Sequence, residues 1–291
     1  MLVALLLFKL VVVVVVRVAA VCPRGAPPVR GVFPRQVFYT GTFEPGLWNR
    51  TQWPRDYTFH FYNNSDLDAS TRELSRDIEG LWEAYSALRP WAFKADLWRY
   101  AILYSCGGIY VDSKMVLTMD FDAFLDIVEP LRKDEKLLVT CIDRWGTSRD
   151  RFKNITAMWQ GFLIAESRQP DLLLALRFAI QNVRRRLYPD DEGVLGALYI
   201  TGPTAMARAI QTQPDWRRRV KLPCHFGNHG GQLRTLAGSG KVIMTQSNKL
   251  HSKLRGGEAH SYPNLYRTRQ VYNDDPPCSQ FCYLLKHKKL H

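Results

Sequence analysis

The stretch from Trp91 to Lys114 constrains the fold most, because it predicts a helix, a stop, a short strand and a carboxylate in immediate succession. Apolar and aromatic side chains recur there at helical spacing: Phe93, Leu97, Tyr100, Ala101 and Tyr104. Gly107-Gly108 can end the helix in a left-handed cap, and residues 109–111 (IYV) suit a buried strand. Asp112 then stands at the carboxyl end of that strand, where open α/β sheets bind their ligands.

Two charged residues of the predicted helix lie next to this carboxylate. Asp96 and Arg99 are three residues apart, so they share one helix face. With Asp112 they would line one crevice, offering carboxylates to sugar hydroxyls and a guanidinium to a diphosphate. The alternative is an Asp96–Arg99 ion pair on the helix surface, worth about 0.3–0.5 kcal/mol.

The segment KADLWRYAILYSCGGIYVDSK resembles the core motif of the DXD-type glycosyltransferases, the sugar-binding-region family (glycosyltransferase family thirty-two). That family includes initiating α-1,6-mannosyltransferases and capsular polysaccharide glycosyltransferases. Nine positions match in register: Asp96, Arg99, Tyr100, Leu103, Gly107, Gly108, Ile109, Tyr110 and Asp112. A T-G-P segment at Thr201-Gly202-Pro203 also matches, about ninety residues further on. The sequence departs from the motif at Lys114, which replaces the second aspartate.

The resemblance implies an α/β fold, a GT-A-like Rossmann-type domain with a mostly parallel central sheet and helices on both faces. It implies transfer of a hexose, mannose or a similar sugar, from a GDP- or UDP-hexose to a glycan or glycolipid acceptor, with retention. By resemblance, Asp112 would bind the ribose and the metal, and Asp96 the donor sugar hydroxyls. Arg99 would lie near the sugar or the phosphates, and Tyr110 beside the nucleotide sugar.

Two further regions of this sequence match parts of the family that approach the donor. Residues 33–40 resemble its opening strand, whose end lies near the nucleotide base, so Tyr39 and Thr40 are candidate nucleotide-sugar ligands. His260 is the candidate ligand of a metal and of the phosphates, with His251 as the competing histidine. Family members usually hold Mn²⁺ or Mg²⁺ through the D-x-D carboxylates, which are the oxygen ligands that hard cations prefer.

Lys114 leaves the metal and the activity open. Three roles are open to the lysine. In the first it supplies positive charge itself, is catalytic together with Asp112, and makes metal dependence weak. In the second the protein is an inactive relative that only binds nucleotide sugars or glycans. In the third it points away, and Asp112 and His260 hold the metal. The resemblance assigns no general base.

The net charge of the chain limits the classes of partner that we expect it to bind. The formal net charge is +13. Such a balance means either a solvated basic surface or attraction to an anion, such as a nucleotide diphosphate, an acidic glycan or a membrane. The basic residues are spread out and carry no nucleic-acid motif, so we expect no nucleic-acid partner.

The N-terminus predicts membrane or secretory targeting. Residues 2–21 are mostly apolar, interrupted by Lys9 and Arg17, so residues 1–22 are expected to form a signal peptide or a signal anchor. A buried strand or helix is the alternative. We expect a linker at 23–31, the transferase domain at 32–275 and a basic tail at 276–291. The protein would then lie in a membrane or a Golgi-like lumen, and otherwise in the cytoplasm.

Cysteines and sequons agree with this location without establishing it. None of the six cysteines has zinc-site spacing. Cys106 is expected to be a core thiol, and Cys278 and Cys282 to pair in an oxidising compartment. Three N-x-S/T triplets begin at Asn49, Asn63 and Asn154. The remaining predicted elements are strands at 57–62, 137–140, 158–165 and 241–245, and helices at 70–88 and from Pro170.

Overall fold

The computed structural model describes Cys22 and residues 33–41, 53–131, 136–143, 155–189, 196–227, 231–236, 240–247 and 262–276. His251, His260, Cys278 and Cys282 lie outside these residues, as do the sequons at Asn49 and Asn154 and the predicted segments 1–21, 23–31 and 277–291. The expected domain boundaries therefore stay predictions. Within the described residues, no helix is both long and apolar enough to cross a membrane.

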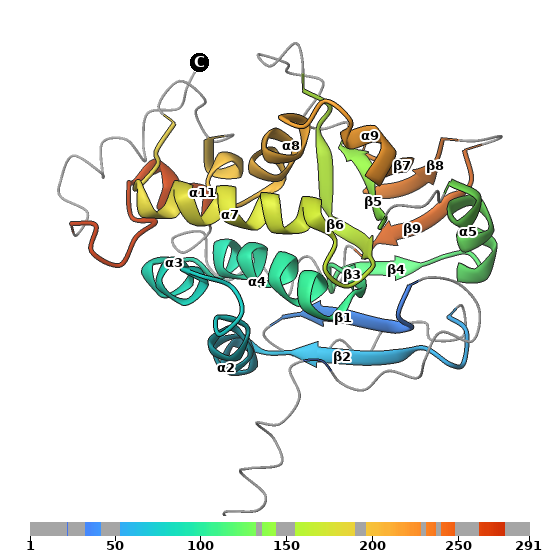
Figure 1. Cartoon of the computed structure of the whole chain (residues 1–291), viewed down its shortest axis with the longest axis horizontal. Coiled ribbons are helices and arrows are strands. Elements are labelled where there is room, and N and C mark those ends of the chain that lie inside the picture. Colours follow the sequence, from blue (N-terminus) through green and yellow to red (C-terminus); the bar gives the residue numbers. More distant parts are fainter. Residues whose placement is uncertain are drawn as a thin grey trace, which may run out of the picture.

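The described strands form one sheet of nine, in the order β2-β1-β3-β6-β5-β7-β8-β9-β4 (Figure 1). The predicted α/β class is confirmed. The strands are β1 (Gln36–Thr40), β2 (Thr58–Tyr62), β3 (Gly108–Val111), β4 (Met115–Leu117), β5 (Leu138–Asp143), β6 (Met158–Ala165), β7 (Val220–Phe226), β8 (Gln232–Thr235) and β9 (Val242–Gln246).

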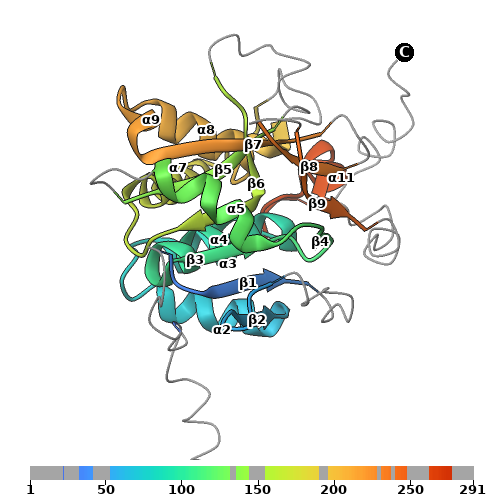
Figure 2. The same ribbon diagram turned by 90° about the vertical axis from the view of Figure 1, so that its right-hand side faces the viewer.

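The sheet is mixed in direction. Pairs β1–β2, β1–β3 and β5–β7 are parallel, whereas β6 pairs antiparallel with both β3 and β5. The pairs from β7 through β8 and β9 to β4 are antiparallel. The expectation of mostly parallel pairing thus applies to the β2-β1-β3 region and to β5–β7. Strands β1, β2, β3, β5 and β7 share one direction, so we call the edge where they end the carboxyl edge, and the other the amino edge. The arrow of β1 points to the carboxyl edge, at the right of Figure 2.

Helices cover both faces, as predicted. They are α2 (Asn64–Leu74), α3 (Leu81–Ala87), α4 (Trp91–Cys106), α5 (Phe121–Val128), the 3-10 turn η2 (Glu129–Leu131), α7 (Pro170–Arg184), α8 (Pro203–Gln211), α9 (Trp216–Arg219) and α11 (Tyr262–Arg267). Strand side chains alternate between two cores: Phe38 and Tyr110 join the core under α4 and α7, while Val37 and Ile109 join the core under α5.

The predicted single helix over residues 70–88 is wrong. Two helices, α2 and α3, occupy this region, because Gly80 takes a left-handed conformation (φ +76°) and begins α3 at the next residue. The first helix starts earlier than predicted, since the Asn63 side chain accepts hydrogen bonds from the backbone N–H groups of Ser65 and Asp66. The polar residues that follow β2 therefore cap a helix.

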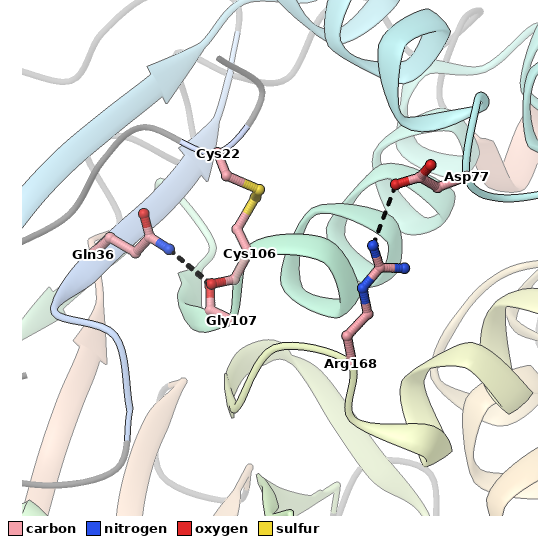
Figure 3. The surroundings of a disulfide bond; sticks show 6 residues. All are labelled: Cys22, Gln36, Asp77, Cys106, Gly107 and Arg168. Atoms are coloured by element: carbon pink, nitrogen blue, oxygen red, sulfur yellow. Dashed lines mark hydrogen bonds and ion pairs between the residues drawn. A yellow bond between two sulfur atoms is a disulfide. The ribbon is translucent and has the colours of Figure 1, made fainter. Parts of the chain in front are cut away.

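Two disulfides join distant parts of the chain. Cys22 is bonded to Cys106, with 5.2 Å between the Cα atoms (Figure 3), which corrects the prediction that Cys106 is a core thiol. The apolar spacing of α4 gave no sign of a partner 84 residues away. Cys141 and Cys224 are bonded between the neighbouring strands β5 and β7, where they are direct partners in the parallel register.

Candidate functional site at the carboxyl edge

The turn from α4 into β3 fixes where the site lies. Gly107 (φ +68°) ends α4, and its N–H donates to the Leu103 carbonyl oxygen at 2.8 Å. A Cβ on Gly108 (φ +101°) would come within 2.7 Å of the Gln36 carbonyl oxygen on β1. Two glycines therefore let the strand start directly against its neighbour. Four strand residues later, Asp112 reaches the carboxyl edge.

Arg99 is the centre of the site. Its guanidinium lies 3.2 Å from a carboxylate oxygen of Asp96 and 3.2 Å from one of Asp112. It also donates to the Gln160 carbonyl oxygen at 3.0 Å and lies 4.4 Å from the centre of the Tyr110 ring. The structure thus brings together the three charged residues that the motif singled out, and the Asp96–Arg99 pair is buried rather than on the helix surface.

Asp96 is held on both carboxylate oxygens. Gln160 Nε2 donates to one at 2.7 Å, and Thr201 Oγ1 donates to the other at 2.9 Å. The Tyr100 hydroxyl is hydrogen-bonded to the Gln160 side chain and to the Thr201 carbonyl oxygen. The sequence analysis missed Gln160 and named Thr201 only as part of the T-G-P match. A polar residue inside the apolar run MWQGFLIA was the available signal for Gln160.

The two carboxyl groups on this guanidinium titrate in opposite directions. Burial outweighs the attraction of Arg99 at Asp96 and raises its pKa to about 6. Burial also opposes ionisation of Asp112, but the charges of Arg99 and Lys114 outweigh it, and the pKa of Asp112 is lowered. Asp112 is therefore the permanent anion of the site at neutral pH, whereas Asp96 takes up a proton in mild acid.

Lys114 and Asp112 form the accessible part of the site. Lys114 Nζ lies 3.8 Å from Asp112 Oδ2, and the side chains of Lys114 and Asp112 are 32% and 21% exposed. Those of Asp96 and Arg99 are each 8% exposed. The Tyr110 hydroxyl donates to Asp112 Oδ1 at 3.1 Å, so Tyr110 supports the carboxylate from within. A ligand approaching the carboxyl edge would meet Lys114 and Asp112 before the other two.

Gly161 on β6 makes room for this carboxylate. The Asp112 N–H donates to the Gly161 carbonyl oxygen at 2.8 Å. A Cβ on Gly161 would lie 2.8 Å from Asp112 Oδ2 and would also collide with the Trp159 ring. That ring is stacked on Phe226 at 4.1 Å, so it cannot easily retreat. Gly161 is a second site residue that the sequence analysis missed.

The residues predicted to lie near the nucleotide base occupy the end of β1. Tyr39 is 1% exposed and packs against Phe61, with 5.5 Å between the ring centres. Thr40 is partly exposed. Because Phe38 is level with Tyr110 in the parallel register, Thr40 is level with Asp112 one strand away. Thr40 therefore lies at the same edge as the charged cluster, while Tyr39 is part of the sheet packing.

The described donor atoms do not fit a divalent cation. Asp112 Oδ1 already accepts from Arg99 and Tyr110, and the Lys114 ammonium faces Oδ2. Across the described residues, no three His, Cys, Asp or Glu side chains gather as a metal site. Mg²⁺ and Mn²⁺ need several oxygen or nitrogen ligands. The predicted ligand His260 lies outside the described residues.

Comparison with known proteins gives one family match. Residues 50–135 match the model of the family described as "Glycosyltransferase sugar-binding region containing DXD motif". The predicted family is thereby confirmed for this segment, which includes α4, β3 and Asp112. No curated protein sequence matches the chain.

Three solved structures show distant likeness. One, described as "PaToxG Glycosyltransferase", is 14% identical with a TM-score of 0.43, covering 62% of this chain and 70% of that one. The ligand-free glycosyltransferase domain from the YGT toxin is 11% identical (TM-score 0.37), covering 56% of this chain and 52% of its own. The UDP-bound form is 11% identical (TM-score 0.32), covering 69% and 60%. This chain thus spans less than two thirds of the YGT domains. None of these structural similarities reaches a TM-score of 0.5, so none indicates what this chain does.

Proposed function

From the match of residues 50–135 to the sugar-binding region of DXD-type glycosyltransferases, we propose that this chain is a glycosyltransferase that uses a nucleotide sugar. The observation that carries the proposal is the Asp112–Lys114 pair at the carboxyl edge, supported from beneath by Arg99. A carboxylate and an ammonium side by side suit a ligand that presents both hydroxyls and a diphosphate. The donor is a GDP- or UDP-hexose, mannose or a similar sugar, and the acceptor is a glycan or glycolipid hydroxyl.

In the transfer, the bond between the anomeric carbon and the diphosphate oxygen breaks, and its electron pair leaves with the nucleoside diphosphate. The acceptor oxygen forms the new bond to that carbon and loses its proton to the departing diphosphate, which has gained the electron pair. The family resemblance implies retention. Charge accumulates on the departing diphosphate, so a cation fixed beside it lowers the barrier. Lys114 is the accessible cation next to Asp112 and takes this role.

The other charged residues position this pair. Asp112 binds ribose or sugar hydroxyls. Arg99 holds the Asp112 carboxylate in place, and Asp96 in turn fixes the position of Arg99. The low exposure of Asp96 and Arg99 supports this division over direct contact of both with the donor sugar. Tyr110 steadies Asp112 through its hydroxyl, and we assign contact with the nucleotide to Thr40, which is partly exposed at the same edge.

Lys114 also supports a weak metal requirement. In the D-x-D pattern the second carboxylate would help to hold Mn²⁺ or Mg²⁺, and here an ammonium stands at that position. The charge on the leaving group is therefore neutralised mainly by the protein. The same lysine supports a second candidate function, a relative that binds nucleotide sugars or glycans without turnover.

The location that we propose is the secretory pathway, with the N-terminal segment as signal peptide or membrane anchor. Two disulfides between described residues support an oxidising compartment. Asn63 of one sequon is described, but its side chain caps α2.

The proposal is tested by measuring hydrolysis and transfer with a panel of GDP- and UDP-hexoses, comparing the full chain with Asp112→Ala. We expect turnover with at least one donor and a loss of about 100-fold or more in the variant. Calorimetry with the same donors separates the two functions. Binding that depends on Asp112 without turnover would identify the inactive relative, and neither binding nor turnover would refute both.

A further inference from the structure

An apolar groove of about 400 Å³ opens at the amino edge, between α9 with the start of β7 and the end of α5. We call it the amino-edge groove; its apolar walls include Ile127, Leu131, Trp216, Leu222 and Leu236. Leu131 is 37% exposed and Leu236 is 45% exposed. Of the three large hydrophobic side chains that are exposed in the described part of the chain, two therefore gather in one place. Such clustering marks an interaction surface more often than scattered exposure does.

Cations border one side of this groove. Arg217 and Lys221 line it, and the Arg217 guanidinium lies 4.4 Å from the centre of the Trp216 ring. Lys221 Nζ donates to the Arg217 carbonyl oxygen at 2.8 Å, and Arg219, on the same helix as Arg217, is paired with Asp171 and Asp215. The α5 side carries the exposed acids Asp126 and Glu129, so the positive charge is confined to the α9 side. The groove thus joins apolar side chains to a basic border.

The register of the sheet places the groove on the same edge as Cys22. Gly108, Ala165, Leu138 and Val220 are successive partners across four strands, so the starts of β3 and β7 are level. Three strand spacings separate them, about 14 Å. Cys106, which holds Cys22, comes two residues before Gly108 (Figure 3). The chain therefore passes Cys22 on the amino edge, while Asp112 lies at the other end of β3.

We propose that the amino-edge groove rests on an anionic membrane surface. Leu131 and Leu236 would enter the interface, and Arg217 and Lys221 would face the lipid headgroups. The argument for a membrane over a protein partner is the sequence that leads into Cys22: residues 2–21 are mostly apolar and are predicted to target a membrane. In this orientation the carboxyl edge, with Lys114 and Asp112, faces away from the bilayer, so of the two proposed acceptors it suits a glycan rather than a glycolipid of the same membrane.

Photocrosslinking tests the contact directly in the full chain. A diazirine side chain at position 236 is compared with one at position 91, on vesicles of phosphatidylcholine with and without phosphatidylserine. Trp91 is the matched control because it is 40% exposed but begins α4, whose 16 residues span about 24 Å from the Cys106 end. We expect at least about ten-fold more lipid adduct at 236. Equal labelling at both positions would overturn the proposal, and so would adducts at 236 to protein instead of lipid.

A charge variant tests the basic border independently of the N-terminal segment, which stays intact. Arg217→Gln should weaken partitioning onto phosphatidylserine vesicles about five-fold, the effect of one cation near an anionic surface. Arg89→Gln, an exposed arginine just before α4, should change it less than two-fold. Turnover in detergent should stay unchanged in both variants. Equal loss in the two variants, or binding that ignores the phosphatidylserine content, would contradict the proposal.

Discussion

The two edges of the sheet have opposite chemistry. At the carboxyl edge, two carboxylates share the buried guanidinium of Arg99. The amino edge lies one strand length away. It carries the Cys22–Cys106 disulfide and the apolar side chains of the amino-edge groove. One sheet thus keeps a buried charged cluster at one end of its strands and an apolar groove at the other. Changes at one edge should therefore leave the function of the other intact.

The largest expected effect comes from removing the shared cation. Arg99→Met leaves two carboxyl groups buried beside an apolar side chain, so we expect the free energy of unfolding to fall by about 3–5 kcal/mol. Denaturant titration measures this. Arg177→Met, at an exposed arginine of α7, should stay within about 0.5 kcal/mol of the wild type. A similar small loss for Arg99→Met would mean that the cluster is not held by its charge.

Breaking the amino-edge disulfide should affect stability without affecting turnover. Cys22→Ser removes a crosslink that closes a loop of 84 residues, which we expect to cost about 2–4 kcal/mol of unfolding free energy. The same preparation, assayed below its unfolding transition, should keep its turnover within about two-fold. A large loss of turnover in the folded variant would show that the two edges are coupled.

The pH dependence of stability separates Asp96 from Asp112. Burial raises the pKa of Asp96 from 3.8 to about 6, so the folded state holds its proton more tightly than the unfolded state does. The wild type should thus lose stability relative to Asp96→Asn as the pH rises from about 4 to 7, by on the order of 2–3 kcal/mol. Urea unfolding of both proteins across this range gives the difference. Asp112 has a lowered pKa, so its stabilisation is lost instead as the solution becomes acidic. A pH-independent difference between wild type and Asp96→Asn would contradict the buried, proton-binding role.

Gly161→Ala should disturb the Asp112–Lys114 pair, and among these variants it should lower the free energy of unfolding least. The added methyl group collides with Trp159 and comes within 2.8 Å of Asp112 Oδ2, so we expect a loss of about 1–3 kcal/mol from overpacking. Turnover should fall by more than this stability loss explains, because the Asp112 carboxylate is displaced from Lys114. Unfolding curves and donor kinetics on one preparation measure both quantities. Full turnover in a folded variant would exclude a role for the exact position of Asp112.

The local part of the site could be predicted from the sequence. Helical spacing, two glycines and a β-branched strand place Asp96, Arg99 and Asp112 within 17 consecutive residues, so their meeting needs only one helix and one strand. Gln160, Gly161 and Thr201 come from segments 60 to 100 residues away. Which strand lies beside β3 is decided by the whole sheet, so their contribution needed the structure.

The prediction was weakest where long-range contacts decide. The break between α2 and α3 depends on the conformation of Gly80, which the apolar spacing of residues 70–88 conceals. The partners of Cys22 and Cys141 were equally hidden, because spacing alone gives no pairing between distant cysteines. The pairing in the antiparallel part of the sheet could not be predicted for the same reason, because β4 and β9 pair although more than a hundred residues separate them.

The most direct test of the central claim, that Lys114 supplies the charge expected of a metal, is donor turnover in EDTA and in Mn²⁺ for three proteins. We expect the wild type to keep its turnover in EDTA within about two-fold, and Lys114→Ala to lose about 100-fold in both conditions. Lys114→Asp, which restores the D-x-D pattern, should need Mn²⁺ for any activity that it has. A wild type that is inactive in EDTA and restored by Mn²⁺ would contradict the account.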